Sequence, residues 1–249
     1  MIADIVTVVW KERKGLLRQR GSRSRAVLTM LIPIIMISIF FPWSMGPDWV
    51  KDPVGVILVS VIIPMLLVGI TIPESFAGER ERHTLETLLA SRLSDRVILF
   101  GKVATSVGYA WVKTLLVLVL SLVTVNIAHW DGHVMFFTPA VAIADVFFSL
   151  IIAVLIASLG VLISLRSATV QGAQQALMAG TMVPIMVLGM VLLVVVQIQP
   201  EMIDRIKEII DTIGSTELVL IIASVLIVIT LVLLRAAMAR FKRARLILD

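Results

Sequence analysis

Six long apolar runs dominate the sequence, and short charged or Pro/Gly-containing joints separate them. A helix needs roughly 20 residues to cross a hydrocarbon core about 30 Å thick. Within a few residues, we place the runs at 26–43, 54–76, 97–127, 137–164, 172–197 and 217–235. The pattern predicts an all-α, polytopic membrane protein with six transmembrane helices in one domain over residues 1–249.

The segment before the first run has the pattern of an amphipathic helix. Over residues 1–22, Ile2, Ile5 and Val9 recur at helical spacing, and Lys11 and Lys14 belong to the opposite face. This predicts an N-terminal interfacial helix whose basic face is attracted to anionic membrane lipid. In the alternative interpretation, these charges only set the membrane topology.

A second amphipathic segment lies between the last two runs. Residues 200–216 place Ile203, Ile206 and Ile210 on one helical face and Asp204 and Lys207 on another. This predicts a surface helix on the outer side, which either caps a translocation path or is a structured loop.

The composition excludes several classes of protein. With 59% hydrophobic and 16% charged residues, the chain has too little polar surface to cover a soluble globule of 249 residues. The pI near 10 does not indicate nucleic acid, because the basic residues lie between apolar runs rather than on one soluble face. The absence of cysteine excludes disulfides, thiolate metal sites and cysteine nucleophiles. After the first run comes Ser-Met-Gly-Pro rather than a small-residue cleavage site, so this run should remain as an anchor.

The basic residues predict the orientation of the chain. Of the 22 lysines and arginines, eighteen fall on one predicted side of the membrane. Lys51, Arg205 and Lys207 fall on the other side, and Lys113 lies within the third run. The positive-inside rule then places both termini in the cytoplasm, and we expect the chain in the inner (plasma) membrane.

The joint between the second and third runs is the longest loop on the predicted cytoplasmic side. Here Leu85, Leu88 and Leu89 fall on one helical face, and Arg82 and Glu86 are spaced for an i,i+4 ion pair. A short amphipathic helix outside the bilayer must bury its leucines, and a groove on a soluble partner would do so. Alternatively, the segment extends the second span and packs on the cytoplasmic ends of its own chain.

Two motifs in this chain resemble a known family. The run Phe-Ala-Gly-Glu-Arg-Glu-Arg at 76–82, followed by Thr-Leu-Glu, Leu-Leu, Leu-Ser and Gly-Lys, resembles the first cytoplasmic loop of ABC-2 type transporter permeases. Leu-Ile-Ser-Leu-Arg at 162–166 with Gln-Gly-Ala-Gln-Gln at 171–175 resembles the family's joint between spans four and five. The family commonly has Gly where this chain has His83, and Thr-Pro where it has Ser91 and Arg92.

The resemblance implies a function and a set of partners. Residues 78–93 would form a coupling helix that seats on an ABC ATP-binding subunit, and two permease chains with two ATPase subunits would form an exporter that works by alternating access. The second permease chain would be either identical or different. The residues implied to couple to the ATPase are Glu79, Arg80, Glu81, Arg82, Thr84, Leu85, Glu86, Leu88 and Leu89.

The sequence lacks a phosphate-binding loop of its own. Such a loop needs a first glycine, then Gly-Lys and Ser or Thr. Arg96 occupies the first glycine position before Gly101 and Lys102, and Val103 follows them. We therefore expect no catalytic, cofactor-binding or metal-binding residue in this chain, with ATP and Mg bound by the partner subunit.

Three ionisable residues within or at the ends of the spans require explanation, because charge in hydrocarbon is costly. Helix rise places Lys113 about 16 Å from Lys102, and Asp145 about 12 Å from the outer end of its span. Since these depths nearly match, we expect the two side chains to pair or to share a polar cavity. With Glu74, they could alternatively carry the coupling of an ion- or proton-driven secondary transporter.

The outer loop contains His129, Asp131 and His133, which raises the possibility of a metal site or an intramembrane enzyme. A site needs three or four convergent ligands, and a short loop with Gly between them does not fix that geometry. Tryptophans near the outer ends of the spans fit an aromatic belt at the interface better than a cofactor site. They are Trp43, Trp49 and Trp130.

Overall fold

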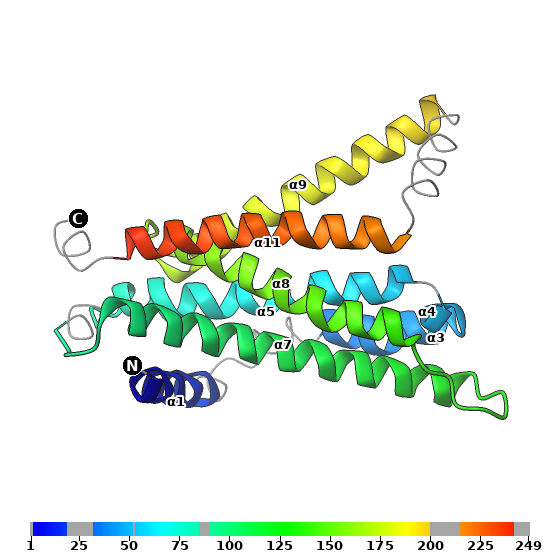
Figure 1. Cartoon of the computed structure of the whole chain (residues 1–249), viewed down its shortest axis with the longest axis horizontal. Helices are drawn as coiled ribbons and strands as arrows, with labels where there is room; N and C mark the ends of the chain where they lie inside the picture. The colour runs from blue at the N-terminus through cyan, green and yellow to red at the C-terminus, as the bar shows by residue number, and fades with distance from the viewer. Residues whose placement is uncertain (1, 19–31, 52, 85–89, 200–214, 242–249) are drawn as a thin grey trace.

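The computed structural model describes residues 2–18, 32–51, 53–84, 90–199 and 215–241, and every regular element in these ranges is a helix (Figure 1). The long helices are α5 (Pro53–Glu81), α7 (Asp95–Ala128), α8 (Pro139–Ser164), α9 (Val170–Ile198) and α11 (Ser215–Arg240). These five are long and apolar enough to cross a membrane. Each begins and ends within five residues of a predicted run, so five candidate spans lie where the second to sixth spans are predicted.

The first predicted run is described only in part. Residues Ile32–Met45 form a shorter apolar helix that contains a π-helical segment, η2 (Met36–Phe40), and α3 (Phe41–Met45). It ends at Gly46, whose φ of 60° favours glycine, and the short helix α4 (Asp48–Lys51) follows. Residues 26–31 lie outside the described residues, so the sixth span stays a prediction.

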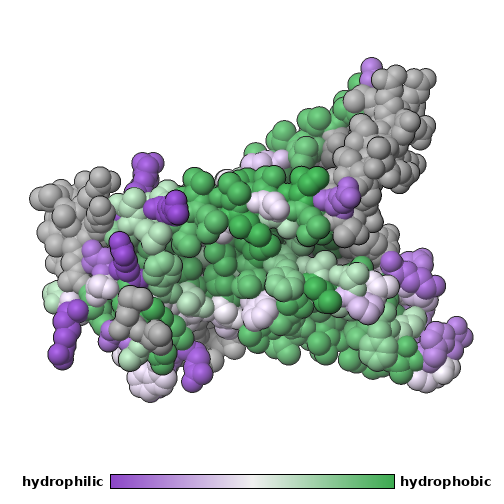
Figure 2. Space-filling view, in the orientation of Figure 1, coloured by the Kyte–Doolittle hydropathy of each residue, from purple (hydrophilic) through white to green (hydrophobic). Residues whose placement is uncertain are grey.

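Helices α5, α7 and α8 enclose the hydrophobic core. The most apolar window of α5 is 61% buried inside the molecule, whereas those of α9 and α11 are only 6% buried. Figure 2 shows hydrophobic residues over the long middle of the molecule and hydrophilic residues gathered at its two ends. This banding is what a bilayer requires, because apolar side chains that face outward then contact lipid.

The two halves of α9 have different surroundings. Leu177, in the first half, is buried and lies beside Gly160 of α8, close to Ile72 of α5. Figure 1 shows the later part of α9 leaving the bundle, and the large apolar side chains that follow Pro184 are exposed. A proline inside a helix removes one backbone donor and favours a bend.

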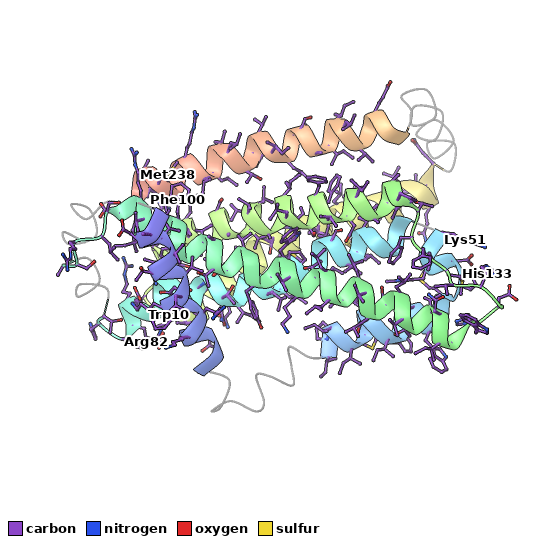
Figure 3. All side chains as sticks on the ribbon, turned by 60° about the horizontal axis from the view of Figure 1, so that its bottom comes forward. Trp10, Lys51, Arg82, Phe100, His133 and Met238 are labelled. Atoms are coloured by element: carbon purple, nitrogen blue, oxygen red, sulfur yellow. The ribbon has the colours of Figure 1, made fainter. Side chains whose placement is uncertain are left out.

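The N-terminal helix α1 (Ile2–Arg18) crosses one end of the bundle instead of running along it (Figure 3). Figure 1 shows the same end of the molecule carrying the α5–α7 loop and the last turns of α11. The predicted helix over 1–22 is thus present from Ile2 to Arg18, and residues 19–22 lie outside the described residues. Of the predicted outer helix over 200–216, residues 200–214 also lie outside them, and Ser215 opens α11.

Candidate functional site

A buried lysine joins three helices at the end of the bundle where α1 lies. Lys102, on α7, is only 1% exposed. Its Nζ lies 3.0 Å from Glu12 Oε1 of α1 and 3.0 Å from Glu79 Oε1 of α5. It also donates to the Ser75 carbonyl of α5 at 2.8 Å. We call Glu12, Ser75, Glu79 and Lys102 the Lys102 cluster.

The charges of the cluster explain its packing. A buried ammonium costs several kcal/mol of desolvation unless it is paired, and two carboxylates with a carbonyl use all three of its donors. The Lys11 ammonium, 3.6 Å from Glu79 Oε1, offsets the second negative charge, although the Lys11 side chain is 59% exposed. The aromatic ring of Phe76 lies 5.5 Å from Lys102 Nζ and packs edge-on against Phe241. Lys102 is therefore a fixed junction of α1, α5 and α7.

Glycine allows α1 to approach α7 this closely. A Cβ atom at Gly101 would lie 2.6 Å from Val8 Cγ1, which is too short for any real contact. Val8 is itself only 4% exposed. The pair Gly101 and Lys102, which opens the third predicted run, thus supplies both the close packing and the charge that hold α1 in place.

The charged motif that ends α5 is also engaged within the chain. Arg82 Nη1 lies 2.9 Å from Glu74 Oε1, and Glu81 Oε2 accepts a hydrogen bond of 2.9 Å from the backbone nitrogen of Val170. Val170 is the first residue of α9, so the Glu81 carboxylate satisfies a free donor and complements the positive helix end. Arg80 is half-buried and makes no ion pair with another described residue.

The end of α5 has the geometry of a Schellman motif. The backbone nitrogen of His83 bonds the Arg80 carbonyl at 3.0 Å, and that of Thr84 bonds the Glu79 carbonyl at 2.9 Å. His83 has a φ of 54°, in the left-handed region that glycine adopts without strain. The position where the resembling family commonly has Gly is therefore the position that requires this backbone conformation.

The predicted coupling helix over 78–93 is corrected by this geometry. Residues 78–81 belong to α5, His83 ends that helix, and residues 90–93 form a turn and bends before α7. The side chain of Ser94 then caps α7 by accepting from the nitrogen of Val97. The segment is thus not one continuous helix. Leu85, Glu86, Leu88 and Leu89 lie outside the described residues.

The structure brings together some of the predicted site residues and adds others. Glu74, Glu79, Glu81, Arg82 and Thr84 gather at the end of α5 and contact their own chain. The structure pairs Arg82 with Glu74, and Glu86, the partner expected from the sequence, lies outside the described residues. The sequence interpretation missed Glu12, Ser75 and Lys102 as site residues, although a lysine eight residues into an apolar helix was a usable signal.

The expected pairing of Lys113 with Asp145 is wrong for this structure. Asp145 is 3% exposed, and both carboxylate oxygens lack a hydrogen-bond partner among the described residues. Trp111, two residues before Lys113, is the side chain that reaches α8, where its Nε1 donates to the Val146 carbonyl at 3.1 Å. Two residues correspond to about 200° around a helix, so Lys113 lies on the opposite flank of α7, half-buried.

The outer loop separates its candidate side chains. Among the described residues, no group of three His, Cys, Asp or Glu side chains could hold a metal ion. His129 packs against Gly46, and His133 Nδ1 lies 3.1 Å from the Asp131 carbonyl oxygen. Trp43 and Trp130 are exposed, as expected for an aromatic belt. The prediction is wrong for Trp49, which is fully buried against Gly55.

A comparison with protein families places most of the chain in a known family. The model of the ABC-2 type transporter family matches residues 3–210. This range runs from α1 to beyond the end of α9 and contains the whole Lys102 cluster. A comparison with curated proteins gives no significant match.

Proposed function

The chain belongs to the ABC-2 type transporter family, and from this premise we propose that it is the membrane subunit of an exporter driven by ATP hydrolysis in a separate subunit. Its family makes it a multi-pass permease of an ABC transporter, a transport component and not an ATPase. The residue-level match of 76–82 and the lack of a phosphate-binding loop support the division of labour between permease and ATPase. The direction of transport, export, is inferred from the resemblance of the sequence motifs to ABC-2 type transporter permeases.

The Lys102 cluster is the observation that carries the mechanism. It joins the last turn of α5, from which the α5–α7 loop leaves, to α1 and to the first turns of α7. Glu81 links the same end of α5 to the start of α9. When an ATP-binding subunit pulls on the loop, these buried contacts transmit the displacement to α1, α7 and α9 together, because packed helices move as units.

We propose that the end with the cluster is cytoplasmic. Most of the described lysines and arginines belong to the helices and loops at this end, in agreement with the positive-inside rule. The crosswise α1 suits the surface of the inner leaflet. It exposes Val6 and Trp10, and Lys14 Nζ lies 3.7 Å from the centre of the Trp10 ring. An apolar face beside basic side chains is the pattern that binds an anionic lipid surface.

Native mass spectrometry of the complex tests the proposal. The chain is extracted from its own membranes in mild detergent, with an affinity tag, and its assembly is weighed intact. We expect an assembly of two permease chains, identical or paired with a second permease, and two ATP-binding subunits. Recovery of the chain without any ATP-binding protein would contradict the proposal and favour the ion- or proton-coupled alternative.

A further inference from the structure

Asp145 is the one described carboxylate that is buried in the middle of the bundle and has no partner for either oxygen. It lies where α5, α7 and α8 meet. Its backbone carbonyl accepts a hydrogen bond of 3.4 Å from Ser60 of α5, and the carbonyl of the next residue, Val146, accepts from Trp111 of α7. An ionisable group held in this position within a membrane is expensive and marks a functional site by default.

Nearby polar side chains do not satisfy the carboxylate. The Ser60 hydroxyl donates to the Asp145 backbone, and the Ser149 hydroxyl, one turn further along α8, donates to the Val146 carbonyl at 3.1 Å. Both serines are fully buried. The donors around Asp145 are therefore used by the backbone, and the carboxylate keeps its capacity for a ligand.

An indole ring lies beside this region. Trp111 contacts α8 directly beside Asp145, where its Nε1 donates to the Val146 carbonyl. Tryptophan is the aromatic side chain that attracts cations most strongly. A carboxylate beside an indole and among the aliphatic side chains of the core suits a ligand with one positive charge and a large apolar surface.

A divalent cation fits the same surroundings less well. Calcium needs several oxygen ligands around one point, usually with more than one carboxylate among them. The described part of the chain offers no cluster of three acidic or histidine side chains there. An organic cation needs only one counter-ion, because its apolar body binds to apolar side chains.

We propose that Asp145 is the anionic anchor of an occluded binding site for a hydrophobic organic cation, formed between α5, α7 and α8. The inference rests on the proposed transport function, because such a cation would be a transported molecule. In the present conformation the site is closed. A shift of α8 from α5 would open it, since Asp145 lies at the contact of these two helices.

Equilibrium binding of tetraphenylphosphonium to the purified chain in lipid nanodiscs tests the site without any ATPase. We expect saturable binding by the wild type, at least tenfold weaker binding by Asp145→Asn, and retained binding by Asp145→Glu. Asp131→Asn, which removes an exposed carboxylate from the outer loop, is the matched control and should bind like the wild type.

Thermal melting of the same proteins separates binding from folding. Asp145→Asn should melt at or above the temperature of the wild type, because it removes an unpaired buried charge. Equal binding by Asp145→Asn and the wild type would overturn the proposal, as would the absence of saturable binding by the wild type. The binding experiment contains no ATP-binding subunit. Its outcome is therefore independent of the native mass spectrometry that tests the ABC assembly.

Discussion

Lys102→Met is expected to lower the free energy of unfolding by about 3 kcal/mol, because it leaves two carboxylates facing each other with no cation between them. This value lies at the low end of the cost of breaking a buried ion pair, because the Glu12 and Glu79 side chains are still 13% and 11% exposed to solvent. Denaturation in detergent, followed by tryptophan fluorescence, measures this loss. Trp10 on α1 reports whether α1 detaches.

Two variants make the result specific to the cluster. Lys11→Met removes an exposed lysine beside the same Glu79, and it should cost less than about 1 kcal/mol, as a surface ion pair does. Lys102→Met combined with Glu12→Gln and Glu79→Gln should recover most of the stability, because no uncompensated charge remains. If Lys102→Met were as stable as Lys11→Met, the cluster would not be holding α1 on the bundle.

The double variant Leu85→Asp/Leu88→Asp is expected to lose its ATP-binding subunit in a pull-down from membranes. Two leucines buried in a protein groove and replaced by carboxylates should cost about 3 kcal/mol or more of binding free energy, roughly a hundredfold in affinity or more. The expectation rests on the spacing of the leucines in the sequence, because residues 85–89 lie outside the described residues. The amount of ATP-binding protein recovered per permease is the measurement.

A matched control tests whether acidic substitution alone causes the loss. Val134→Asp/Phe136→Asp changes two exposed apolar residues in the loop at the opposite end of the molecule. This variant should recover the same amount of the ATP-binding subunit as the wild type. If both double variants lost the subunit equally, general destabilisation of the chain would explain the result. If neither lost it, the leucines would have another role.

The membrane-spanning helices could be predicted from the sequence because their signal is local. A run of about 20 apolar residues defines a span whatever lies beside it, and five described helices match such runs closely. The end of α5 was harder to place. The family resemblance implied one coupling helix from 78 to 93, whereas the left-handed backbone at His83 ends α5. Histidine gives no such signal in a sequence, as glycine would have done.

The candidate site could be predicted only in part, because its contacts join residues far apart in the chain. Glu12 and Lys102 are separated by 90 positions, and Glu81 and Val170 by 89. Helical periodicity relates only residues on the same helix. Helix rise similarly gave the depths of Lys113 and Asp145 but not the rotation of α7, which turns Trp111 to α8 instead.

Photo-crosslinking at position 88 tests the central claim most directly, that this permease seats its α5–α7 loop on a separate ATPase. A benzophenone amino acid replaces Leu88 in the full chain, and intact cells are irradiated before the membranes are solubilised. Position 136, in the opposite loop, is the control. We predict a crosslink from position 88, and none from position 136, to a protein that mass spectrometry identifies by its phosphate-binding loop. A wild-type level of folded permease with no such crosslink from position 88 would contradict the account.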